Sequence, residues 1–500
     1  MSAHFVQAPG SDAGIASEPM SDLDGLRADL DGDLLTPGSP GYDAARAPAI
    51  SRFRDVRPQA VVRCASARDV ARTLGHARAT GTHVVPRGGG HCFAGRSSTD
   101  GLLLDLGRLD TVEVAGDGRA TIGAGARLAQ VYDALHARGR TIPAGCGPTV
   151  GIVGLTLGGG LGLLGRAYGL TCDVLVGAQV VLADGRCLDC DANREPELFW
   201  ALRGAGGGQF GVVTALVFDT VPEPRATRFE LHWPAGSAAA VIAAWQGWAP
   251  DAPDDITANL TVVAEPGGPL RVVVFGAALR DTDATGALLD ELATAVGARP
   301  EAHLRGGLPV RDLKRSFAEP DQGMEAPPTT SRSEFFDRPL PAATIAELLD
   351  GLAGRRQELN FTAMGGAYNR VAPDTTAFAH RNARFLLEHL GDDGGRVDRS
   401  WAIAHAHGSG RVYPNFPDPG LADWAEAYHG GNLARLVAAK QRYDPDRLFR
   451  FPQSLPAQIT GARRSGGPVD EGAPAQPLQD DVEAVVELAR PVVGAEIVGQ

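Results

Sequence analysis

A histidine inside a glycine-dense turn is the residue of this chain best placed to do chemistry. The run from Arg87 through Gly88, Gly89, Gly90, His91 and Cys92 to Gly95 lies between two apolar runs, 84–86 and 102–104. A strand, a tight glycine turn and a second strand expose several backbone N–H groups in one concave place, which suits a phosphate. We therefore predict a large phosphate-bearing cofactor with its reactive part near His91. The alternative is a turn histidine that hydrogen-bonds only to backbone.

A second glycine cluster runs from 145 to 165 and contains a GxGxxG match at Gly160–Gly165. That dinucleotide fingerprint needs a strand before it and a helix opening at it. Here another glycine-rich stretch precedes the match, and Tyr168-Gly169 soon interrupts any helix. A nicotinamide dehydrogenase is therefore the weaker alternative.

Composition excludes several classes of partner. The formal net charge of −13 argues against nucleic acid and anionic membranes, which call for basic patches. The six cysteines form no paired clusters with histidines, so we expect no metal site. The N-terminus lacks a basic region followed by an apolar run, and no apolar stretch of about twenty residues exists. We expect a cytoplasmic protein with no membrane partner.

Mixed helices and strands that do not alternate strictly favour an α+β fold over a doubly wound one. Ser66 and Asp69 resemble a capping box before a helix, and a second helix is expected over 128–135. Strand-like runs lie at 121–122, 174–182 and 212–218, and Asp184-Gly185 is a hairpin turn.

The composition changes at Pro222-Glu223-Pro224, where two prolines end a strand. We expect strands at 260–263 and 271–275 and a helix over 340–352 beyond it. The predicted organisation is a mobile N-terminus (1–25), a cofactor domain (26–224), a substrate domain (225–405), a C-terminal segment returning to the cofactor domain (406–456), and a linker and tail (457–500), with a short helix at 480–490.

Several motifs in order resemble the berberine-bridge-enzyme-like FAD-linked oxidases of the vanillyl-alcohol-oxidase superfamily. They are the two glycine clusters, Arg166–Leu170 with Asp173, Phe199–Gly204 followed by Gly206–Gly208 and Phe210–Thr214, Tyr413–Phe416, and the run from Tyr428 to Gln453. The resemblance covers roughly residues 30 to 456. It implies a PCMH-type FAD-binding domain of two subdomains, and a substrate domain with an antiparallel sheet covered by helices.

In that family the histidine of the first turn is bonded to the 8α carbon of the flavin, and His91 matches it. Many members add a bond from a cysteine to flavin carbon 6. That cysteine's place is taken here by Gly147, and Cys146 stands one residue earlier. A one-residue offset turns a side chain to the other face of an extended segment, although a glycine neighbour can absorb the shift. A second flavin bond and a simple buried thiol remain equal alternatives for Cys146.

The resemblance also assigns the rest of the cradle. Around the pyrophosphate it places Arg87, Gly88, Gly89, Gly90, Cys92 and Gly95; beside the isoalloxazine Gly151, Gly154, Leu155, Gly158 and Gly159; and at more distal parts of the cofactor Asp173, Val212 and Val213, with Asn415 as a further contact. The alternative for the glycines is a set of turns without a ligand.

A flavoenzyme that oxidises an alcohol needs a base to take the hydroxyl proton while hydride leaves carbon. Tyr413 matches the family position with this role, and Tyr368 is a second candidate; each has a structural tyrosine as its alternative. We therefore expect an oxidase that acts on an alcohol, a sugar or a secondary metabolite and passes electrons to molecular oxygen, giving hydrogen peroxide. A flavin-binding protein without turnover is the rival hypothesis.

Overall fold

A computed structural model describes residues 22–317, 330–352, 354–456 and 458. Residues 22–25, expected in the mobile N-terminus, begin helix α1 (Asp22–Asp29). The rest of that segment, nearly all of the expected tail and the expected helix at 480–490 lie outside the described residues. Helices and sheets are mixed along the chain, which confirms the α+β class.

The first sheet has four strands in the order β1-β2-β4-β3 and carries the first glycine turn at the end of β3. Its strands are β1 (Asp33–Leu35), β2 (Ala60–Arg63), β3 (Val84–Arg87) and β4 (Leu102–Asp105), with β2, β3 and β4 parallel. Helices α2 (Tyr42–Arg46) and α3 (Ala67–Thr80) contact this sheet, at β2 and β4 respectively. The expected cap is confirmed, because Ser66 Oγ accepts from the Asp69 amide at 3.4 Å.

The second sheet is antiparallel, with the order β5-β6-β10-β8-β9. Its strands are β5 (Val112–Val114), β6 (Arg119–Gly123), β8 (Leu175–Val181), β9 (Cys187–Cys190) and β10 (Val212–Asp219); a separate pair is β7 (Arg140–Thr141) with β11 (Val221–Pro222). The hairpin at Asp184-Gly185 is confirmed, with Gly185 at φ +86°. Helices α4 (Leu128–His136), α5 (Ile152–Leu157), α6 (Gly165–Tyr168) and α7 (Pro196–Leu202) complete this part.

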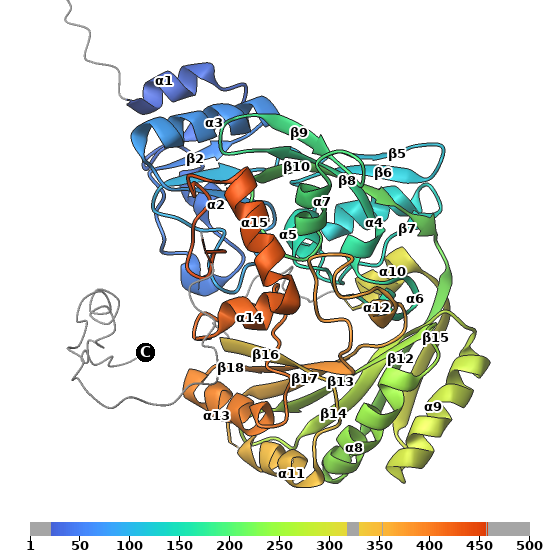
Figure 1. The fold of residues 1–500 in the computed structure, drawn as a ribbon. Helices are drawn as coiled ribbons and strands as arrows, with labels where there is room; N and C mark the ends of the chain where they lie inside the picture. The colour runs from blue at the N-terminus through green and yellow to red at the C-terminus, as the bar shows by residue number, and fades with distance from the viewer. Residues whose placement is uncertain (1–21, 318–329, 353, 457, 459–500) are drawn as a thin grey trace, which may run out of the picture. The chain divides into compact units, whose positions relative to one another are not determined.

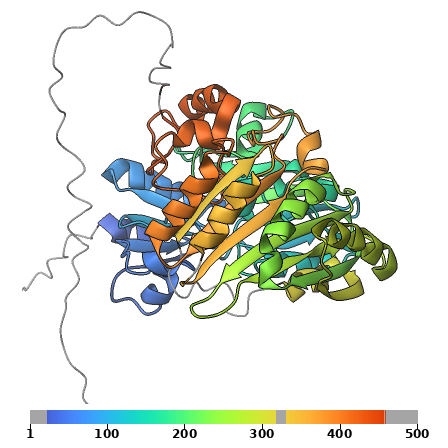
Figure 2. The same cartoon turned by 90° about the horizontal axis from the view of Figure 1, so that it is seen from below.

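The third sheet has seven antiparallel strands in the order β15-β12-β14-β13-β17-β18-β16. They are β12 (Arg225–Trp233), β13 (Ile256–Ala264), β14 (Arg271–Ala278), β15 (Glu301–Pro309), β16 (Thr330–Phe336), β17 (Gln357–Ala363) and β18 (Phe385–Gly391). Helices α8 (Ala238–Trp248), α9 (Thr282–Val296), α11 (Ala342–Gly351) and α13 (Gly394–His405) cover one face, as Figures 1 and 2 show. The helix expected over 340–352 is confirmed as α11. Two shorter helices are α10 (Val310–Ser316) and α12 (Ala367–Arg370).

The opposite face of this sheet is turned toward the glycine-rich segment. Side chains alternate along a strand, so Leu386 of β18 lies on the other face from Phe385 and Leu387, which pack under the helices. Leu386 instead packs with Leu170 and Tyr413 in a separate buried cluster. This packing places the polar residues of that face near the second glycine cluster.

The C-terminal helices α14 (Trp424–His429) and α15 (Leu433–Tyr443) carry the chain back, and α15 lies against α7 (Figure 1). A buried ion pair fixes this return. Lys440, 1% exposed, donates to the Gln209 and Phe449 carbonyls at 2.5 and 2.6 Å and to Asp444 at 2.6 Å. Every proton of the ammonium group therefore has an acceptor.

Replacing Lys440 with Met should lower the free energy of unfolding by about 3–5 kcal/mol, because it leaves the Asp444 carboxylate buried without its counter-charge. Urea unfolding measures the change. The matched control is Arg442→Met on the same helix, whose side chain is 60% exposed and pairs with Glu195; we expect a loss of about 0–1 kcal/mol there. Equal losses in both variants would contradict this account of the C-terminal return.

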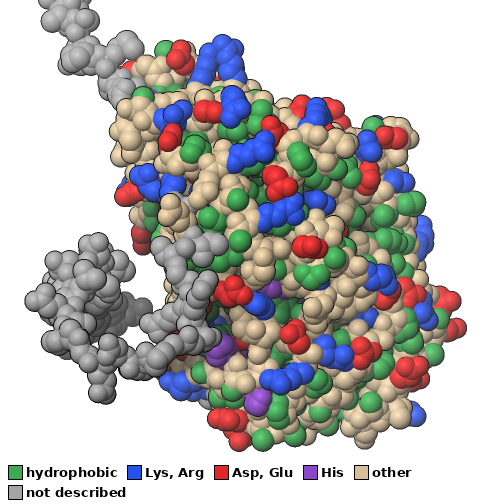
Figure 3. Space-filling view, viewed as in Figure 1, with side chains coloured by type: hydrophobic (Ala, Val, Ile, Leu, Met, Phe, Trp, Pro, Cys, Tyr) green, Lys and Arg blue, Asp and Glu red, His purple; other side chains and the backbone are tan. Residues whose placement is uncertain are grey.

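Charges of both signs are spread over the face shown in Figure 3, with no large area of one sign. In the part of the chain that the structure describes, no helix combines the length and the hydropathy of a membrane span. The same residues contain no group of three or more His, Cys, Asp or Glu arranged to hold a metal ion.

Candidate functional site

The two glycine clusters meet backbone to backbone beside His91. A Cβ on Gly89 would lie 2.2 Å from the Gly151 nitrogen, and one on Gly151 would lie 2.4 Å from the Gly89 nitrogen. Neither position has room for a side chain. The contact brings His91 Nε2 to 3.0 Å from Thr149 Oγ1, so the predicted flavin-bonding histidine is held against the second cluster.

The loops around this contact fit a flavin dinucleotide. Residues 91–98 and 145–150 are only partly buried, so both loops leave backbone and side chains partly accessible. Gly154 at the start of α5 is exposed, and nothing lies within 4 Å of where its Cβ would be. Two glycine loops with accessible backbone beside an imidazole match the predicted cradle.

Two of the predicted cradle side chains are engaged elsewhere. The Arg87 guanidinium, 6% exposed, donates to the Ser97 and Arg46 carbonyls at 2.8 Å, and burial lowers its pKa to about 10. Asp173 accepts from both terminal nitrogens of buried Arg381, at 2.7 and 2.9 Å. These two side chains therefore brace the loops, and any contact of theirs with FAD stays a prediction.

Other predicted cradle residues have neighbours of their own. Val212 and Val213 are buried in the hydrophobic core. A Cβ on Gly158 would lie 2.1 Å from Asn415 Oδ1, and one on Gly159 would lie 2.9 Å from the Phe378 ring. The absent side chains at 158 and 159 therefore make room for Asn415 and Phe378, so their flavin contacts also remain untested.

The Tyr413 phenol oxygen is the focus of three N–H donors. The amides of Gly160 and Leu161 donate to it at 3.0 and 3.1 Å, and Asn415 Nδ2 donates at 3.0 Å. Asn415 Nδ2 also donates to the Leu155 carbonyl at 2.8 Å, which fixes its orientation. Among the described residues no acceptor takes the Tyr413 proton, so this proton is available to a ligand.

Burial raises the pKa of Tyr413 to about 12, and the hydrogen bonds from Asn415 and the two amides act in the opposite direction. The ring is surrounded by the aromatic side chains of Phe335, Phe378 and Phe416, with centroids 5.1–6.2 Å away. At neutral pH the phenol is therefore protonated.

The hydroxyl of Tyr368, the second catalytic candidate, makes two hydrogen bonds to the backbone of one residue, Gly162. It accepts from the Gly162 amide at 3.0 Å and donates to the Gly162 carbonyl at 2.8 Å. Its side chain is 1% exposed, and burial raises its pKa. This arrangement favours the structural alternative, in which Tyr368 holds the glycine-rich segment.

Glu388 on β18 is a titratable group that the sequence analysis did not single out. It lies one side-chain repeat along the strand from Leu386, on the face that is turned toward Tyr413. Burial raises its pKa to about 7, nearby Glu358 raises it further, and hydrogen bonds from Ser331 and Asn360 lower it. Ser331 Oγ donates to Glu388 Oε1 at 2.7 Å. The sequence signal that could have pointed to Glu388 is the presence of one acidic residue within the apolar run 385–390.

Ser333 pairs with Glu388 across β16 and β18 and carries a buried hydroxyl that has no hydrogen-bond partner among the described residues. Beside it on the same face lies Phe335, which packs with Tyr413. This face of the sheet therefore carries the Glu388 carboxyl, the unsatisfied Ser333 hydroxyl and the Phe335 ring. Such an arrangement suits a polar ligand.

Cys146 stands close to a lysine that the sequence analysis also missed. Its thiol packs against the buried cluster of Leu163, Leu308 and Leu313. Two residues before it, the Ala144 carbonyl accepts a hydrogen bond from Lys314 of α10, which is 2% exposed. A lysine in a seven-residue amphipathic helix gives no sequence signal of burial.

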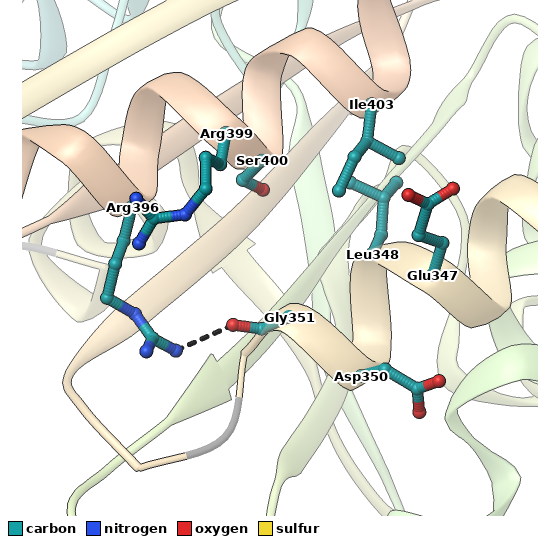
Figure 4. A pocket seen from close by; sticks show the side chains of 8 residues that line it. All are labelled: Glu347, Leu348, Asp350, Gly351, Arg396, Arg399, Ser400 and Ile403. Carbon is teal, nitrogen blue, oxygen red and sulfur yellow. Dashed lines mark hydrogen bonds between the residues drawn. The ribbon is translucent and has the colours of Figure 1, made fainter.

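A surface groove of about 440 Å³ lies between α11 and α13, away from these residues (Figure 4). Leu348 and Ile403 line it with charged side chains of both signs, and Arg396 closes one end by donating to the Gly351 carbonyl at 2.6 Å. It lies on the helix-covered side of the third sheet, opposite to Glu388.

Family models match two segments of the chain. An FAD-binding domain model matches residues 58–191, which include His91 and Cys146. A model described as berberine and berberine like matches residues 412–456, which include Tyr413 and Asn415. The two matched segments are the ones that meet at the Tyr413 phenol.

Relatives cover nearly the whole described chain. An uncharacterised FAD-linked oxidoreductase of Bacillus subtilis is 33% identical over 445 residues, which is 85% of this chain and 97% of that protein. A chitooligosaccharide oxidase of Gibberella zeae is 30% identical and covers 75% of this chain and 82% of its own length.

A solved structure agrees with these matches. The berberine-bridge-enzyme-like protein 1 of Physcomitrella patens superposes with a TM-score of 0.80 at 27% identity, over 87% of this chain and 99% of that one. The fold thus has the expected FAD-binding part and the antiparallel, helix-covered sheet. The cofactor is FAD, the protein is an enzyme, and the chain belongs to the berberine-bridge-enzyme-like FAD-linked oxidoreductases.

Proposed function

We propose that this protein oxidises a hydroxyl group of a small polar molecule, with FAD bonded through His91 and molecular oxygen as the electron acceptor. The FAD-dependent oxidase class follows from the relatives. The attachment at His91, the acceptor and the site residues are our own assignment. They are supported by the open glycine loops around His91 and by the polar sheet face opposite Tyr413.

The bound FAD supplies the hydride acceptor for the reaction. The Gly89–Gly151 contact and Thr149 fix the position of the imidazole that carries it. Phe335 and Phe378 pack around Tyr413 and keep water from the side of the ring that they cover. Residues of the cofactor part (26–224) and the C-terminal segment (406–456) thus hold the redox group, and residues 225–405 supply the sheet that meets the substrate.

Glu388 is the group that we assign to accept the substrate proton. A general base works best when its pKa lies near the working pH, and the pKa of Glu388 is about 7. The phenol of Tyr413, with a pKa of about 12, is ionised to only about one part in 10⁵ at pH 7. Ser331 and Asn360 orient the Glu388 carboxyl through hydrogen bonds.

Tyr413 is assigned to position the substrate oxygen. Its oxygen accepts from three N–H groups, and these bonds direct its own proton outward. That proton is free to be donated to the reacting hydroxyl and to orient it toward Glu388. Tyr413 thus keeps a catalytic role, but as a hydrogen-bond donor in place of the base that the sequence indicates.

Sugars and other polyols are the substrate class that the sheet face fits best. Thr261, Asn360 and Ser333 offer hydroxyl and amide groups on the same face as Glu388, and Ser333 has an unsatisfied hydroxyl. Such groups hydrogen-bond to substrate hydroxyls and reject analogues that lack them. Two of the relatives are a chitooligosaccharide oxidase and a xylooligosaccharide oxidase.

The observation that carries the proposal is the buried carboxyl of Glu388, with a pKa of about 7, on the face of β18 from which Leu386 packs with Tyr413. The test is a panel of mono- and oligosaccharides and simple alcohols, with hydrogen peroxide measured as product. Anaerobic mixing with an active substrate should bleach the flavin absorbance, and air should restore it. If no member of the panel bleaches the flavin, a flavin-binding protein without turnover becomes the better account.

A further inference from the structure

Glu334 is a buried carboxylate on β16, the edge strand of the third sheet beside β18. Its side chain is 1% exposed, and a glutamate is rarely buried so completely unless it is paired. It shares the helix-covered face of the sheet with Phe336, two residues along the strand. Glu334 Oε2 lies 2.7 Å from His405 Nδ1, and Oε1 accepts from the Gly410 amide at 2.6 Å. Both partners belong to the stretch of chain that leads from the end of α13 to Tyr413.

The turn that follows α13 is built against this carboxylate. A Cβ on Gly408 would lie 2.1 Å from Glu334 Oε1, so position 408 has no room for a side chain. Gly410 has a φ of +72°, which favours glycine. The His405 ring stacks on Trp401 with ring centroids 4.2 Å apart, and this contact orients the imidazole toward the other carboxylate oxygen. The carboxylate therefore holds the turn at two points.

Beyond the turn, the chain pairs with β16 itself. The Ser409 amide and hydroxyl donate to the Phe335 carbonyl at 3.1 and 2.6 Å, and the Phe335 amide donates to the Arg411 carbonyl at 2.8 Å. Two residues later comes Tyr413, whose ring centroid lies 6.2 Å from that of Phe335. Glu334 and Phe335 are neighbours whose side chains lie on opposite faces of β16. One strand thus holds the chain before Tyr413 from both of its faces.

We propose that Glu334 is a positioning residue: its buried carboxylate holds the turn at 408–410 and thereby sets where the Tyr413 phenol stands relative to the substrate. The inference rests on the role proposed above for Tyr413 and deepens it. Loss of the carboxylate would release the turn on one face of β16, and the phenol would shift with the turn. A displacement of about 1 Å near the reacting atoms can cost about 10²-fold in rate.

The first test is kinetic. Glu334→Ala should lower kcat/KM by about 10–10²-fold. Glu334→Gln should restore it to within about threefold of the wild type, because its amide oxygen can accept from Gly410 and its amide nitrogen can donate to a neutral His405. The matched control is Glu426→Gln, since Glu426 is 59% exposed and pairs with Arg411 of the same stretch at 2.6 Å; its kcat/KM should be unchanged. A Glu334→Gln variant as slow as Glu334→Ala would overturn the proposal.

A double-mutant cycle with Tyr413→Phe separates positioning from folding. If Glu334 acts through the Tyr413 hydroxyl, Glu334→Ala should lower kcat/KM by less than about threefold once that hydroxyl is absent. Its effect on the melting temperature should persist in both backgrounds. Equal losses of kcat/KM in the two backgrounds would show that Glu334 serves only the stability of the fold.

The second test needs no substrate. The Gly160 and Leu161 amides donate to the Tyr413 oxygen, so their hydrogen exchange reports whether the phenol is in place. Glu334→Ala should accelerate exchange in the peptide that contains these two amides, as Tyr413→Phe should, whereas Glu334→Gln and Glu426→Gln should not. Exchange that is unchanged in Glu334→Ala would contradict the inference.

Glu334→Asp takes the place of Glu334→Ala if the alanine variant does not fold. It keeps the charge but is one methylene too short to reach both Gly410 and His405, so the same losses are expected; wild-type kinetics and exchange would then refute the proposal. If the wild-type protein oxidises no substrate, the proposed function fails, and the exchange measurement decides the role of Glu334 by itself.

Discussion

Glu388→Gln should lower kcat/KM by about 10²–10⁴-fold, the usual contribution of a positioned general base. The amide keeps the shape of the side chain and its place beside Ser331 and Asn360, but it cannot accept a proton. Burial raises the pKa of Glu388 to about 7, and only the ionised carboxylate is a base. In the wild type, kcat/KM should therefore fall tenfold per pH unit below pH 7 and level off above it.

The pH profile of each variant decides this assignment. Glu388→Gln should be slow at every pH and should lack the limb near pH 7. Glu358→Gln is the matched control on the neighbouring strand β17. Its carboxylate raises the pKa of Glu388, so its removal should move the limb to lower pH and leave the plateau in place. A Glu388→Gln variant that keeps the limb at pH 7 would show that another group takes the proton.

Tyr413→Phe should lower kcat/KM by about 10²-fold, because the ring remains but the donor that positions the substrate oxygen is lost. It also leaves the amides of Gly160 and Leu161 without their acceptor, at a cost of about 1–3 kcal/mol in the free energy of unfolding. Steady-state kinetics and urea unfolding measure the two effects separately.

Tyr368→Phe is the informative comparison for Tyr413→Phe. It removes the two hydrogen bonds to Gly162 and should lower stability by a similar amount. A larger loss of kcat/KM in Tyr413→Phe than in Tyr368→Phe separates positioning from folding. Equal kinetic losses would contradict the role of Tyr413 and would indicate that both phenols only hold the glycine-rich segment.

Local patterns were enough to predict several elements of the fold. The cap at Ser66, the hairpin at Gly185 and the helix at 342–351 each depend on residues within one or two turns of chain. The glycine clusters indicated a cradle, but they did not show that Gly89 and Gly151 touch. That contact joins positions sixty-two residues apart, and a pattern within one segment carries no information about it.

The missed site residues are ones whose chemistry comes from their surroundings. Glu388 is one acid in a strand, and its raised pKa comes from burial and from Glu358 on a neighbouring strand. Lys314 is one lysine in a short helix, and the Ala144 carbonyl that accepts its hydrogen bond lies in a distant loop. The reverse holds for Arg87 and Asp173, whose positions within motifs suggested ligand contacts, whereas the structure shows each hydrogen-bonded to protein groups.

The central claim is that FAD is chemically attached at His91 beside the Gly89–Gly151 contact. The most direct test is to precipitate the purified wild-type protein with acid, digest the pellet and map the flavin by mass spectrometry. We predict a yellow pellet in which the flavin mass lies on the peptide that contains His91. A colourless pellet, with all of the flavin in the supernatant or none in the preparation, would contradict it.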